Sequence, residues 1–165
     1  MEAYNGWVLL HIIGVAGFLT AHGASTMLTF RVRKGSDPAK LGALLEFSGS
    51  TTAVMGVSLL LLLVGGVVAA FLHQLWGQWW LWSSLVLLIL MSAVMTPLAA
   101  GYFNQVREAV GVQTYQQKKK GIEPSAPDPE RLATLQASNR PMLIAAVGLG
   151  GLLLILFLMV YKPGS

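Results

Sequence analysis

The stretch WVLLHIIGVAGFLTAHGASTMLTF, residues 7–30, decides the fold because it is long and apolar enough to cross a bilayer as one helix. It contains His11 and His22, the only ionisable side chains expected deep inside the membrane. They are eleven residues apart, or about three helical turns, so both imidazoles leave one helix face, about 16 Å apart along the axis. That face also carries Gly14, and a stripe of small and polar residues indicates contact with protein or a cofactor rather than lipid.

The composition extends this conclusion to the whole chain. Apolar residues make up 55% of the 165 residues and charged residues only 11%, and the mean hydropathy is +0.64. Three further runs reach spanning length without Asp, Glu, Lys or Arg, at about 52–73, 80–103 and 141–161. The sequence therefore predicts an all-α, four-transmembrane-helix bundle in contact with the lipid bilayer, with residues 1–165 forming a single integral membrane domain.

The basic residues predict the orientation of this bundle. Every Lys and Arg except Lys162 lies in the segments 31–51 and 104–140, which join consecutive spans on one side. By the positive-inside rule these segments are cytoplasmic loops, so both termini are expected outside the inner (plasma) membrane. The same rule accounts for the net charge of +4, and nucleic acid is therefore not an expected partner. Cysteine is absent, which excludes disulfides, thiolate metal sites and iron–sulfur clusters.

Each loop contains an Asp-Pro pair that predicts a helix start, Asp37-Pro38 in the first and Asp128-Pro129 in the second. Both helices are expected to lead into the following span, whereas the polar segment 113–127 between them is expected to be a mobile linker. Two interpretations of the recurrence stay open. The chain is a tandem of two parallel helix pairs, or such caps recur by chance in membrane proteins.

Helix geometry sorts the candidate ligands by depth. Counted from the span centres at about 1.5 Å per residue, His11 lies about 10 Å toward the outside and His22 about 6 Å toward the cytoplasm. His73 is expected about one turn above His11, and Met95, beside Pro97, is expected near the level of His22. Haem needs His or Met axial ligands and small residues that admit a flat macrocycle. We therefore predict b-type haem for electron transfer or haem-dependent redox chemistry, with His11, His22 and His73 as candidate ligands and Gly14 providing space.

Two alternatives remain. Imidazole and thioether groups suit copper, so His11, His22 and Met95 are also candidate metal ligands of a copper-handling protein. In the other alternative the histidines are structural, and His22 accepts or donates a hydrogen bond, for example with the carbonyl of Ala93 that Pro97 leaves free. The chain would then be a non-catalytic subunit, in a homo-oligomer or a larger membrane complex. The spans lack buried carboxylates and an evident nucleophile with its base, so the sequence assigns no catalytic residue.

Short motifs add a resemblance. The run Trp7-Val8-Leu9-Leu10-His11-Ile12-Ile13-Gly14-Val15-Ala16-Gly17 resembles the first helix of the CopD-like membrane proteins, which include copper-resistance proteins and a four-helix family of unknown function. Trp80-Leu81-Trp82, Tyr102-Phe103 and Val106-Arg107-Glu108-Ala109 look like the unknown-function branch, and haem-containing HemJ-type oxidases are distantly similar. The resemblance covers residues 5–110 and implies a haem-ligand role for His11. The spans contain no Lys, which departs from the oxidases.

Overall fold

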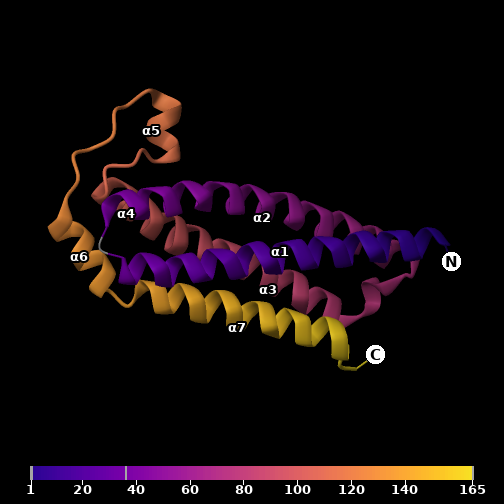
Figure 1. The fold of residues 1–165 in the computed structure, drawn as a ribbon. Coiled ribbons are helices and arrows are strands. Elements are labelled where there is room, and N and C mark those ends of the chain that lie inside the picture. The colour runs from indigo at the N-terminus through magenta and orange to yellow at the C-terminus, as the bar shows by residue number, and fades with distance from the viewer. Residues whose placement is uncertain (1, 36, 165) are drawn as a thin grey trace.

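Four long rods of helix run side by side in the computed structural model, which describes residues 2–35 and 37–164 (Figure 1). The described residues form helices and connecting loops without any strand. The rods are α1 (Glu2–Lys34), α2 (Pro38–Leu72), α3 (Trp79–Met95) continued by the π-helical turn η2 (Thr96–Ala100) and α4 (Gly101–Ala109), and α7 (Arg140–Tyr161). All four are long and apolar enough to cross a membrane, and this confirms the predicted all-α four-helix bundle.

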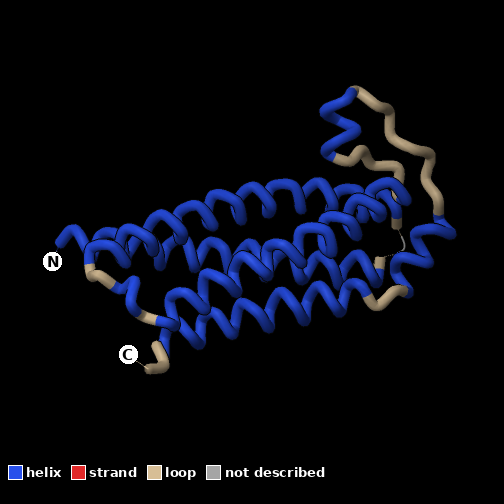
Figure 2. The backbone as a smooth tube through the Cα atoms, turned by 180° about the vertical axis from the view of Figure 1, so that it is seen from behind, coloured by secondary structure: helices blue, strands red, loops and turns tan. Residues whose placement is uncertain are grey.

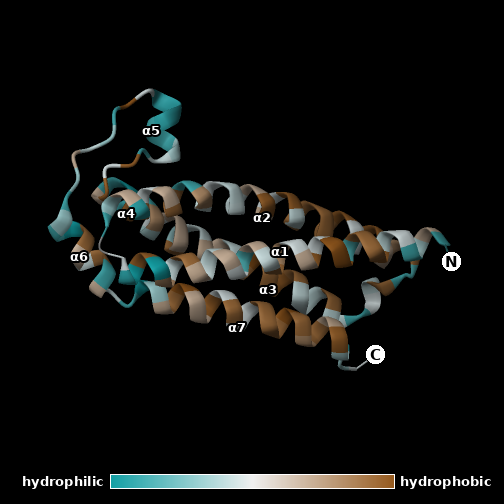
Figure 3. Cartoon of the chain, in the orientation of Figure 1, coloured by the Kyte–Doolittle hydropathy of each residue, from teal (hydrophilic) through white to brown (hydrophobic). Residues whose placement is uncertain are grey.

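The two ends of the bundle differ. Both described termini lie at one end, which we call the terminal end, together with the 3-10 turn η1 (Leu75–Gly77) (Figures 1 and 2). The short helices α5 (Tyr115–Lys120) and α6 (Pro129–Ala137) lie at the opposite, loop end. Hydrophobic residues follow the rods and hydrophilic ones gather at the loop end (Figure 3). Large apolar side chains such as Ile89 and Leu153 are each 66% exposed on the outside, which is the surface that lipid tails cover.

Glycines bring the rods together in pairs. Helix α1 packs so closely along α2 that a Cβ on Gly14 would overlap the backbone of Leu62, and a Cβ on Gly65 would lie 2.6 Å from the backbone nitrogen of His11. Helix α3 packs along α7, where Gly151 faces the side chain of Met91. Each pair therefore joins rods that are consecutive in sequence, as a tandem of helix pairs requires.

The helices that begin at the loop end agree with the sequence predictions only in part. Asp37 caps α2 by accepting a hydrogen bond from the Ala39 N–H at 3.0 Å, and α2 continues without a break into its span. Asp128 caps α6 in the same way, with the Arg131 N–H at 2.9 Å. The expectation that this second helix leads into the span was wrong, because α6 ends at Ala137. Pro141 explains the break, since it cannot donate to a carbonyl four residues earlier.

The connecting segment 113–127 is not wholly irregular. It contains α5, which begins with a capping box in which Thr114 and Gln117 satisfy each other's backbone groups. Pro97 lies in the π-helical turn η2, which interrupts the regular helix between α3 and α4.

A buried apolar cluster closes the loop end and unites α1, α2, α4, α6 and the start of α7 around Tyr102 and Val106, both 0% exposed. Polar side chains complete it. Arg107 donates to the Leu45 carbonyl at 2.7 Å and to the Ser48 hydroxyl at 3.0 Å. Gln136 donates to the carbonyls of Val32 and Gly35 at 2.8 and 2.6 Å. The two helix pairs are therefore tied together by directed hydrogen bonds at this end.

The α1–α2 contact gives a first prediction. Gly14→Ala should lower the free energy of unfolding in detergent by about 1–3 kcal/mol, because the new methyl group must push Leu62 away. Gly56→Ala on α2 is the matched control, since nothing lies within 4 Å of its Cβ position. It should be neutral or stabilise by up to about 1 kcal/mol, because alanine favours helix. Equal effects of the two substitutions would show that the close approach at Gly14 is not important.

Candidate functional site

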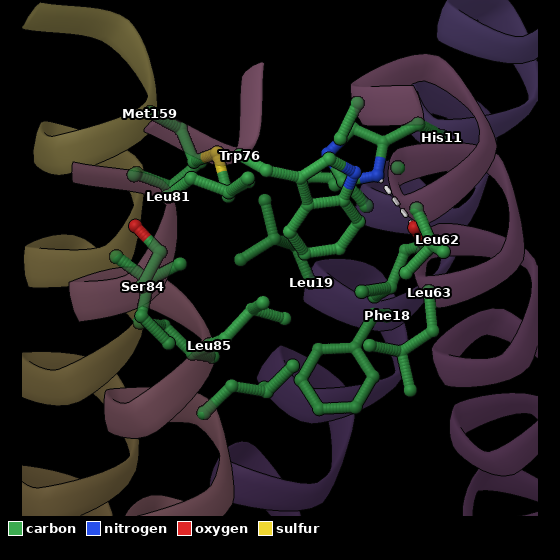
Figure 4. Close-up of a pocket in the computed structure, with 18 residues that line it drawn as sticks. His11, Phe18, Leu19, Leu62, Leu63, Trp76, Leu81, Ser84, Leu85 and Met159 are labelled. Atoms are coloured by element: carbon green, nitrogen blue, oxygen red, sulfur yellow. Dashed lines mark hydrogen bonds between the residues drawn. The ribbon is translucent and has the colours of Figure 1, made fainter. Parts of the chain in front are cut away.

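A cavity of about 110 Å³ lies between the two helix pairs in the terminal half of the bundle (Figure 4). All four rods and η1 contribute to its wall, and two thirds of the residues that line it are Leu, Val, Ile or Phe. The groups with polar or sulfur atoms in the wall are His11, Trp76, Ser84 and Met159. An apolar wall with a few polar atoms is typical of a site for a small hydrophobic molecule or cofactor.

His11 is held in a fixed orientation on this wall. Its Nδ1 lies 2.6 Å from the carbonyl oxygen of Leu62 on α2. A carbonyl can only accept, so Nδ1 carries the proton and donates, and the neutral ring then has its lone pair on Nε2. Gly66 makes this approach possible, because a Cβ there would lie 2.8 Å from Nδ1. The bundle therefore fixes the orientation of the His11 ring, and in the neutral ring Nε2 is the nitrogen available to a ligand.

The other wall groups were not identified from the sequence. The indole Nε1–H of Trp76 is shielded from solvent and has no hydrogen-bond acceptor among the described residues. The hydroxyl of Ser84 is already used, since it donates to the Trp80 carbonyl at 2.8 Å. Met159 brings a thioether from α7 to the side of the cavity away from His11 (Figure 4). Counting depth inward from the end of the fourth span would have placed Met159 near the level of His11.

His22 belongs to a separate place toward the middle of the bundle. It is 8% exposed, and its Nε2 has no hydrogen-bond partner among the described residues, the Ala93 carbonyl included. The ring stacks on Phe18 with 6.1 Å between centroids. Nε2 and the methyl group of Met95 both lie against the bare Cα of Gly148 on α7. The structure thus brings His22 and Met95 together, at the common depth that helix geometry predicts.

The remaining candidates lie elsewhere. The His73 ring contacts the Tyr4 ring at the terminal end, 3.7 Å between centroids, and His73 does not line the cavity. Gly14 provides the contact with Leu62 on the α1–α2 side and is likewise not part of the cavity wall. Across residues 2–35 and 37–164, no three His, Asp or Glu side chains gather closely enough to hold a metal ion.

None of the protein-family models, curated proteins and solved structures compared with this chain matches it. The resemblance to the CopD-like proteins stays a prediction. The structure therefore contains two candidate ligand sites, namely the cavity with His11 and the contact between His22 and Met95.

Proposed function

We propose that this integral membrane protein binds b-type haem in the cavity, with His11 as an axial ligand, for electron transfer or haem-dependent redox chemistry. The observation that carries the proposal is the hydrogen bond from His11 Nδ1 to the Leu62 carbonyl. Histidines that bind metals usually donate their second ring nitrogen to such an acceptor, which fixes the ring and increases the basicity of the free nitrogen. The resemblance of the first helix to haem-binding relatives of the CopD-like proteins points to the same residue.

The donor set around the cavity fits haem. His11 provides an imidazole from one helix pair, and Met159 provides a thioether from the other. A His/Met pair is an established axial set that raises the reduction potential of haem. His22 and His73 lie outside the cavity wall, so Met159 replaces them as the candidate second ligand.

The residues around the ligands determine what the site can do. A macrocycle needs more room than about 110 Å³, so haem binding would require the apolar side chains between the two helix pairs to move apart. Bound haem would supply reversible one-electron exchange. The Leu, Val and Ile wall would exclude water, and the shielded Nε1–H of Trp76 would donate to a polar group of the bound molecule.

The spectrum of the purified protein tests this proposal. The full chain, expressed with haem supply, should show a Soret band with about one haem per chain, and His11→Ala should lose it because the axial ligand is gone. His73→Ala, which removes an imidazole at the terminal end outside the cavity, should keep the band. Met159→Leu should keep haem but lower its reduction potential. A full haem content in His11→Ala, or a colourless unmodified chain, contradicts the proposal.

A second candidate function is copper handling at His22. The observation that favours it is the buried, unpartnered Nε2 of His22 next to Met95, with Met91 one turn along α3 against Gly151. An imidazole with thioethers in an apolar environment is a donor set that suits Cu(I). Leaving Nε2 unsatisfied costs about 1–3 kcal/mol, and a bound ion would offset that cost.

Metal titration separates this function from the first. Cu(I) should bind one per chain, and His22→Ala and Met95→Leu should each weaken binding by at least about tenfold through loss of a ligand. His11→Ala is the control and should leave the copper affinity unchanged. Binding that is equal in all variants would exclude His22 as a ligand. Absence of both haem and copper, with co-purification of a larger complex, would support the non-catalytic subunit instead.

A further inference from the structure

A basic groove of about 290 Å³ opens at the loop end of the bundle, where α1 ends and α2 begins. It lies apart from the cavity and from His22, and neither proposed function uses it. Its wall carries three cationic side chains, one carboxylate and two leucines, namely Arg31, Lys34, Lys40, Asp37, Leu41 and Leu44.

The single carboxylate does not neutralise the groove. Asp37 Oδ1 accepts hydrogen bonds from the backbone N–H groups of Lys40 and Ala39, and these bonds hold the pKa of the carboxyl below its ordinary value. Its Oδ2 lies 3.5 Å from the ammonium of Lys40, so these two charges offset each other. Arg31 and Lys34 have no acidic partner within the described part of the chain. The groove therefore has an excess of about two positive charges.

The negative partial charge at the end of α1 is partly offset by hydrogen bonds. The last carbonyl groups of a helix carry partial negative charge and would normally repel an anion. Here the carbonyls of Val32 and Gly35 accept hydrogen bonds from the Gln136 amide, at 2.8 and 2.6 Å. Two carbonyl groups at this end of the first span are therefore already hydrogen-bonded to a side chain from α6.

Apolar side chains continue from the groove toward the membrane centre. Arg31 follows the last apolar residue of the first span, so the groove lies at the depth of lipid headgroups. Met27, one turn before Arg31 on the same face of α1, is 73% exposed. Phe47 continues the Lys40–Leu44 face of α2 and is 59% exposed. An occupant with both a negative headgroup and acyl chains matches this arrangement better than a free anion.

We propose that this groove binds the phosphate headgroup of an anionic phospholipid. Arg31 and Lys34 contact the phosphate, and the acyl chains lie along the exposed apolar faces of α1 and α2 that carry Met27 and Phe47. Basic pockets at the ends of transmembrane helices are established binding places for such headgroups.

The test uses the full chain in a non-ionic detergent and follows its thermal unfolding as phosphatidylglycerol, phosphatidylcholine or inorganic phosphate is added. Phosphatidylglycerol should raise the unfolding temperature, and the other two should not at equal concentration. The double variant Arg31→Gln with Lys34→Gln should bind phosphatidylglycerol about thirtyfold more weakly. The double variant Lys118→Gln with Lys119→Gln removes the same charge from α5, away from the groove, and should bind normally.

Several results would overturn the proposal. Equal affinity in the Arg31/Lys34 and Lys118/Lys119 variants would exclude the groove, and equal stabilisation by phosphatidylcholine would exclude recognition of charge. Equal stabilisation by inorganic phosphate would make the occupant a free anion rather than a lipid. Native mass spectrometry of the unmodified chain gives a readout that does not depend on the folding of any variant. It should show phosphatidylglycerol retained in preference to phosphatidylcholine, and the reverse preference would also contradict the proposal.

Discussion

The close approach of α1 and α2 at Gly14 and Gly65 is the constraint on which the candidate site depends. In a bilayer, apolar side chains gain little by contacting each other instead of lipid, so helices associate where small residues allow their backbones to come near. This approach places His11 where Nδ1 reaches a carbonyl of the neighbouring helix, and Gly66 leaves room for the ring. Glycine acts similarly on α7, where Gly148 admits His22. The positions of both imidazoles thus follow from residues that have no side chain of their own.

The two imidazoles nevertheless differ in how their polar atoms are satisfied. His11 makes a hydrogen bond through Nδ1 and lines the cavity, whereas His22 Nε2 is buried without any described partner. An unsatisfied polar atom is more costly in a membrane than in a soluble protein, because water is not available to replace the missing bond. The Trp76 indole adds a second shielded donor at the cavity. A ligand that bonds to such a group recovers this free energy, so both places are suited to binding one.

Much of the architecture could be predicted from the sequence because it depends on local chemistry. Length and composition predict four rods, Asp37 predicts the start of α2, and rise per residue predicts that Met95 lies near the depth of His22. Other features depend on how each rod is rotated, which composition does not specify. The cavity and the place of Met159 in its wall are of this kind, and a methionine in an apolar span cannot be told from ordinary packing. His73 follows the last residue of α2, and its ring lies against the Tyr4 ring rather than in the cavity wall.

The two helix pairs are held together by different contacts at the loop end and around the cavity. At the loop end, Arg107 and Gln136 link segments of the two halves by hydrogen bonds to backbone carbonyls, around a core that includes the fully buried Tyr102. Around the cavity, the halves meet mainly through leucine, isoleucine and valine side chains. Separating apolar side chains to admit an apolar molecule replaces one set of nonpolar contacts by another, whereas separating the loop end would break several hydrogen bonds. The contacts around the cavity would therefore cost less to separate than the hydrogen-bonded contacts that hold the pairs together at the loop end.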